Sequence, residues 1–63
     1  MIKISVAHPD YRAGATTQAS ELLAGAHVHH MVEGDLISVL YSTQFERGYT
    51  RLLEAGFEIV LRP

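Results

Sequence analysis

The sequence predicts an α+β domain whose strands and helices follow one another in the order β-α-β-β-α-β. Two observations predict this class. Four short segments carry the alternating or β-prone residues of strands, and two other segments place apolar residues at helical spacing. Because the 63 residues contain no internal repeat, linker or low-complexity stretch, we expect one compact domain over residues 1–63.

Four segments have the pattern of β-strands, and they cover residues 1–7, 27–33, 36–42 and 57–61. The first alternates strictly between apolar and polar residues, which is typical of a strand with one buried face. Gly34-Asp35 separates the second and third strands, and glycine at the first loop position suits a two-residue type II′ hairpin. The expected cross-strand pairs are Glu33 with Leu36, Val32 with Ile37, Met31 with Ser38, His30 with Val39, His29 with Leu40, Val28 with Tyr41 and His27 with Ser42.

Two segments have helical periodicity, and they cover residues 17–24 and 44–55. The first helix has an alternative start as early as Asp10, if Gly14 is tolerated inside it. The spacing of threonine and glutamate before the second helix is that of a capping box. The expected N-caps and C-terminal stops are Thr16 or Thr17 and Gly25 for the first helix, and Thr43 (with Glu46) and Gly56 for the second.

This order of elements is that of the ferredoxin-like fold, a four-stranded antiparallel sheet with two helices on one face. Two helices cover only one side of such a sheet, so we expect the other side to stay open. The fold hosts many unrelated functions, and function must therefore be argued from individual residues.

Strand alternation divides the side chains of the sheet between its two faces. We assign to the helix-covered face Ile2, Ile4, Val6, Val28, His30, Val32, Ile37, Val39, Tyr41, Phe57, Ile59 and Leu61. The open face then carries Lys3, Ser5, His27, His29, Met31, Leu36, Ser38, Leu40, Glu58, Val60 and Arg62. A hairpin loop with an odd number of residues would exchange the two sets in the 27–42 hairpin.

Composition excludes several function classes. The formal net charge is −2, with five basic and seven acidic residues interspersed, so nucleic-acid binding lacks its usual basic footprint. The outward positions of the central strands hold no aromatic residue to stack on RNA bases. No cysteine is present, which excludes disulfides and thiolate zinc sites. With no signal peptide and no apolar run long enough for a bilayer, we expect a cytoplasmic protein without membrane contact.

Residues 27–30, "HVHH", hold three of the four histidines. On a strand, His27 and His29 share a face and lie about 6–7 Å apart, close enough to share one metal ion. Their expected neighbours supply no third ligand, so they are weak candidates, and His30 is expected to be a satisfied core residue. The loop from His8 to Thr17 is a weak anion candidate, with Arg12, Thr16 and Thr17 near a helix N-terminus. We expect no cofactor.

Catalytic residue sets are scarce. The chain has no G-x-S-x-G elbow, no activated nucleophile and no carboxylate pair, so we expect no enzyme. The leading hypothesis is a small protein-interaction module, acting as an inhibitor (phage-encoded ones included), an adaptor or a subunit. Its partner is another protein or a second copy in a homodimer. The expected partner-binding residues are Met31, Leu36, Ser38, Leu40 and Val60, with His27 and His29 at the edge. The alternative is a protein that binds a divalent metal or a small anion.

Overall fold

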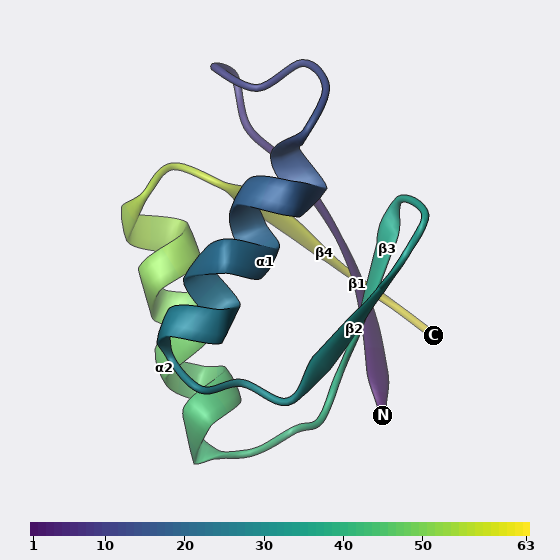
Figure 1. Cartoon of the computed structure of the whole chain (residues 1–63), viewed down its shortest axis with the longest axis vertical. Helices are drawn as coiled ribbons and strands as arrows, with labels where there is room; N and C mark the ends of the chain where they lie inside the picture. Colours follow the sequence, from purple (N-terminus) through teal and green to yellow (C-terminus); the bar gives the residue numbers. More distant parts are fainter.

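The computed structural model describes all 63 residues and has the expected order of elements. The elements are β1 (Ile2–Ala7), α1 (Ala15–Gly25), β2 (His30–Glu33), β3 (Leu36–Val39), α2 (Thr43–Glu54) and β4 (Glu58–Arg62). The strands form one antiparallel sheet in the order β2-β3-β1-β4, with both helices on one face (Figure 1). The fold is therefore ferredoxin-like, as predicted. Neither helix combines the length and the apolarity that a membrane-spanning helix requires.

The β2–β3 hairpin has the predicted register. Its four pairs run from Glu33 with Leu36 to His30 with Val39. Gly34 has a φ of 62°, and Asp35 has no positive φ, which fits a turn with glycine at its first central position. Because the loop has two residues, the assignment of β2 and β3 side chains to the two faces is confirmed.

The hairpin is shorter than predicted at its open end. Pairing starts at His30 and not at His27, although the Leu40 N–H still donates to the His29 carbonyl at 2.9 Å. The expected pairs of Val28 with Tyr41 and of His27 with Ser42 are wrong. The chain on both sides of the hairpin is used instead to end one helix and to begin the other.

Helix α1 ends differently from the sequence expectation. Gly25 is its last helical residue and not the stop. His27 follows with a φ of 60°, and the N–H groups of His27 and Val28 bond back to carbonyls of the last helical turn at 3.0 Å each. At the other end, Gly14 precedes the helix with a φ of 93°, and residues 16–17 lie inside the first turn. The expected threonine cap is therefore wrong.

Helix α2 begins one residue earlier than predicted. Ser42 is the N-cap, and its Oγ accepts a hydrogen bond from the Phe45 N–H at 3.2 Å. The expected capping box on Thr43 is therefore wrong. The predicted stop is confirmed, because Gly56 has a φ of 93° and the N–H groups of Gly56 and Phe57 bond back into the helix at 3.0 Å each.

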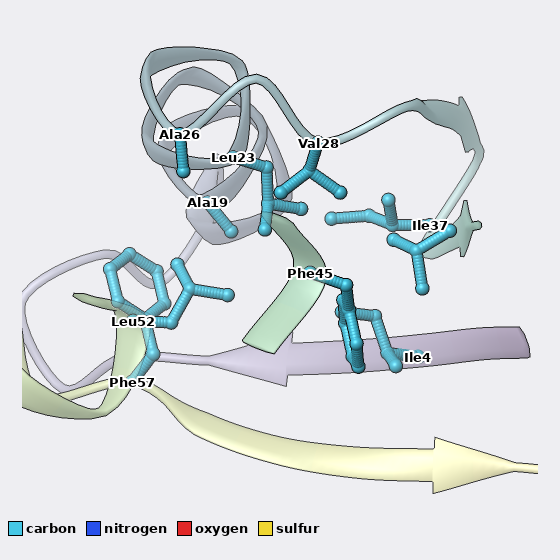
Figure 2. Close-up of a cluster of buried hydrophobic side chains, with 10 residues drawn as sticks. Ile4, Ala19, Leu23, Ala26, Val28, Ile37, Phe45, Leu52 and Phe57 are labelled. Carbon is cyan, nitrogen blue, oxygen red and sulfur yellow. The ribbon is translucent and has the colours of Figure 1, made fainter. Parts of the chain in front are cut away.

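The hydrophobic core lies between the helices and the helix-covered face of the sheet (Figure 2). Its ten buried residues are Ile4, Ala19, Leu23, Ala26, Val28, Ile37, Val39, Phe45, Leu52 and Phe57. Helix α1 packs on β1, β2 and β3, whereas α2 packs on α1 and β4. Three residues assigned to the covered face, Val32, Tyr41 and Leu61, are nevertheless exposed.

Candidate binding surface

The histidine cluster does not form a metal site in the structure. His27 lies in the left-handed turn after α1, outside any strand, so it does not share a strand face with His29. The predicted His27–His29 pair is therefore wrong, although both side chains are exposed. No group of three or more histidine, aspartate or glutamate side chains lies close enough to hold a metal ion.

His30 is satisfied inside the fold, as predicted. Its Nδ1–H donates to the Val28 carbonyl at 2.8 Å, and its Nε2 lies 2.8 Å from the Ser20 hydroxyl of α1. Because a carbonyl oxygen only accepts, Nδ1 must carry a proton, and Nε2 is then free to accept from Ser20. His30 thus joins the start of β2 to α1.

The anion candidates Arg12, Thr16 and Thr17 do not line a pocket in the structure. Arg12 and Thr17 are exposed and Thr16 is half-buried. The N-cap position of α1 is a glycine, and no side chain bonds to the first turn. The structure brings none of the three side chains into a common pocket with the others.

His8 holds this loop against the end of α2. Its Nε2 lies 2.7 Å from the Ala55 carbonyl, and its Nδ1 accepts from the Asp10 N–H at 3.1 Å. These two partners require the Nε2–H tautomer, because the carbonyl accepts and the amide donates. The imidazole also packs against both Tyr11 and Phe57, with ring centroids 4.8 and 4.7 Å away. His8 is a structural contact between two distant segments.

We expect His8→Ala to lower the free energy of unfolding by about 1–3 kcal/mol, since it removes two hydrogen bonds and two aromatic contacts. Urea denaturation followed by circular dichroism measures the change. His29→Ala is the matched control, because His29 is exposed and its loss should change stability by no more than about 0.5 kcal/mol. Equal effects of both changes would contradict a bridging role for His8.

The open face is the side of the sheet that neither helix covers (Figure 1). We use this name for the outward-pointing residues Lys3, Ser5, Met31, Glu33, Leu36, Ser38, Leu40, Glu58, Val60 and Arg62. Met31, Leu40 and Val60 are each about half exposed, and Leu36 is half-buried. The face therefore presents apolar side chains from three of the four strands and the segment after β3.

All polar residues on the open face except Glu58 are paired with one another. The Ser38 hydroxyl donates to Glu33 Oε1 at 3.1 Å, and Lys3 Nζ lies 3.9 Å from the same oxygen. On the other side of β1, Arg62 Nε donates to the Ser5 hydroxyl at 3.2 Å. The centre of the face is thus mainly polar, with the half-buried Leu36 between Glu33 and Ser5, and the exposed apolar side chains lie around it.

Two of the predicted partner-binding residues do not fit the surface. Ser38 is only 7% exposed, because its neighbours on the open face cover it, so it offers a partner little area. His27 lies off the sheet altogether. The surface retained from the prediction is Met31, Leu36, Leu40 and Val60, with His29 beside Leu40 at the edge.

A groove on the helix side was missed by the sequence reasoning. It has a volume of about 310 Å³ and lies where α2 leaves the ends of β1 and β4 uncovered. Its apolar lining consists of Ile2, Tyr41, Phe45, Tyr49 and Leu61. The ring centroids of the three aromatic residues are 5.7 and 5.9 Å apart in succession. The spacing of Phe45 and Tyr49 was a signal in the sequence, since side chains four apart meet on one helix face, whereas Tyr41 precedes the helix.

The chain therefore has two uncovered surfaces, the open face and the groove, on opposite sides of the sheet. The open face draws its residues from all four strands, whereas the groove borders β4 alone among the edge strands. Comparison of the chain with protein-family models, with curated proteins and with solved structures finds no match.

Proposed function

We propose that this protein is a non-enzymatic interaction module that docks on a protein partner through its open face. The observation that carries the proposal is the exposure of Met31, Leu40 and Val60 on a side of the sheet that no helix covers. Apolar side chains gathered on an uncovered sheet face favour a binding surface, because burying each of them against a partner contributes about 1–3 kcal/mol.

The polar centre of the open face supports the same proposal. Lys3, Ser38 and Glu33 already contact one another, as do Arg62 and Ser5. A charge that keeps its partner when water is excluded costs less to bury than an unpaired one. A protein surface with apolar side chains around a polar centre therefore complements this face. Such a module acts by covering a surface of its partner, as an inhibitor, an adaptor or a subunit does.

The test begins with a photo-reactive amino acid placed at position 31 or at position 32 in native cells. Met31 is 58% exposed and Val32 is 45% exposed, and the two neighbours point to opposite faces of β2. We expect a discrete cross-linked partner from position 31 and none from position 32. The binding of that partner to the purified variants is then measured.

We expect Met31→Asp with Leu40→Asp to weaken this partner's binding by at least about tenfold, which corresponds to about 1.4 kcal/mol. Both side chains are exposed, so the double variant should stay folded. Val32→Asp is the control of matched exposure and should bind as the unchanged protein does. Full binding by the double variant, or equal cross-linking from both positions, would rule out docking through the open face.

A further inference from the structure

Strand β4 is an edge strand that exposes apolar side chains on both of its faces. Its only neighbour in the sheet is β1, so one row of its backbone N–H and C=O groups has no strand partner. Four of its five residues are exposed. Val60 is 50% exposed on the open face, and Leu61 is 56% exposed beside the groove. Such an edge is a template for pairing with another strand.

We propose that β4 pairs antiparallel with β4 of a second copy, about a twofold axis through Val60. The strand reads Glu58-Ile59-Val60-Leu61-Arg62, which is self-complementary when two copies run in opposite directions. Glu58 then lies opposite Arg62 of the second copy, and Ile59 lies opposite its Leu61. Both charge pairs and all the apolar residues find suitable partners, because the strand carries opposite charges at equal distances from its centre.

The register is specified by the residues of β4 themselves. In an antiparallel ladder about a twofold axis, the side chains of paired residues must point to the same face of the sheet. Their backbone N–H and C=O groups must either both point toward the partner strand or both point away from it. Registers centred on Ile59, Val60 or Leu61 all meet this condition. A centre on Ile59 brings Glu58 opposite Val60, and a centre on Leu61 brings Arg62 opposite Val60. Only the centre on Val60 uses the whole strand and pairs every charge with its opposite.

The other edge strand offers no comparable register. A twofold axis through Met31 would pair Glu33 of β2 with His29 of the second copy. An axis through Val32 would pair Glu33 with Met31 of the second copy. Neither register brings two opposite formal charges together. Glu33 is moreover occupied within its own chain by Ser38 and Lys3. The charge pattern therefore favours β4 as the edge through which two copies associate.

The pairing joins the two four-stranded sheets into one continuous sheet with all helices on the same side. It covers Leu61 and closes the side of the groove that borders β4. It also places two open faces side by side, with the Glu58–Arg62 pairs between them. The inference goes beyond the docking proposed above and does not depend on it, because the two surfaces share only residues of β4.

The experiment is a charge exchange followed by analytical ultracentrifugation. We expect the unchanged protein to sediment as a dimer in the micromolar to millimolar range. Glu58→Arg alone and Arg62→Glu alone each turn both attractive pairs into repulsive ones, and each should raise the dimer dissociation constant by at least about tenfold. An equimolar mixture of the two single variants restores two attractive pairs, so the mixture should form a heterodimer.

Controls separate this pairing from other associations. Ser5→Ala removes the bond that Arg62 makes within its own chain and should leave the dimer intact. Because the chain has no cysteine, Val60→Cys should form a disulfide across the axis, where paired Cα atoms lie about 4.5–5.5 Å apart, whereas Met31→Cys should not.

A monomeric unchanged protein at millimolar concentration would overturn the proposal. A dimer that tolerates both single charge reversals would overturn it as well, as would a mixture that fails to associate. The docking test at positions 31 and 32 is unaffected by either result, so failure of one proposal is distinguishable from failure of the other.

Discussion

Leu23→Ala is expected to lower the free energy of unfolding by about 2–5 kcal/mol, because deleting buried methyl groups loses transfer free energy and leaves a cavity. The Leu23 side chain is 0% exposed, belongs to the last turn of α1 and lies against Gly48 of α2 (Figure 2). A domain of this length has a total stability of only about 3–9 kcal/mol. The single change therefore removes a large share of it.

Urea denaturation measures this loss directly. Leu53→Ala is the matched control, since Leu53 is also a helical leucine but is half exposed. We expect the control to cost less than about 1 kcal/mol. If the two substitutions destabilised the protein equally, the core would not be centred on the contact between the two helices.

Gly48→Ala is expected to destabilise the protein, although alanine is the better helix former by about 1 kcal/mol. A Cβ at Gly48 would lie 2.8 Å from Leu23 Cδ2 and 2.8 Å from Val28 Cγ2. Both neighbours are buried, and overpacking of this kind costs about 1–3 kcal/mol. The clash should outweigh the gain in helix propensity and leave a net loss of up to about 2 kcal/mol.

Gly25→Ala is the control, because Gly25 is also helical and the nearest atom to its added Cβ would be Arg51 Nη1, 3.9 Å away. This change should stabilise the protein by about 0.5 kcal/mol. Thermal unfolding of the two variants should therefore shift in opposite directions. A stabilising Gly48→Ala would show that α1 and α2 separate easily. In the Leu23→Ala background, the same change should cost less, because one of the two close contacts is removed while the one with Val28 remains.

The paired part of the β2–β3 hairpin was predictable from the sequence to the level of individual pairs. Strict alternation in β1 identified its buried face, and Gly34-Asp35 set the register of the β2–β3 hairpin. These signals are local and have a period of two, so a correct turn fixes the register of every pair that forms behind it. Gly56 was an equally direct signal for the end of α2, because its φ of 93° favours glycine.

The helix ends were less predictable because several residues compete for each cap. Ser42 and Thr43 are both good N-caps, and local sequence does not decide between them, whereas the structure uses Ser42. After α1, a glycine precedes the true stop by two positions. Histidine is among the few other residues that accept a positive φ, so His27 takes the left-handed turn. That turn removed His27 and Val28 from the strand.

The candidate surfaces were predictable only in part. Alternation correctly placed Met31, Leu40 and Val60 on the side of the sheet away from the helices. The burial of Ser38 was not predictable, since it depends on the two charged side chains that close over it. The groove depends on how far α2 extends over β4, and one-dimensional periodicity carries no information on that extent.

The central position of β1 has a consequence for the order of events during folding. Both of its neighbours, β3 and β4, come from the second half of the chain, and even the closest pair along the sequence joins Ser5 to Leu36. Closing such loops costs chain entropy before any contact compensates for it. The β2–β3 hairpin and the two helices involve only nearby residues. They should therefore form early and transiently, and the arrival of β1 between β3 and β4 should be the rate-limiting step.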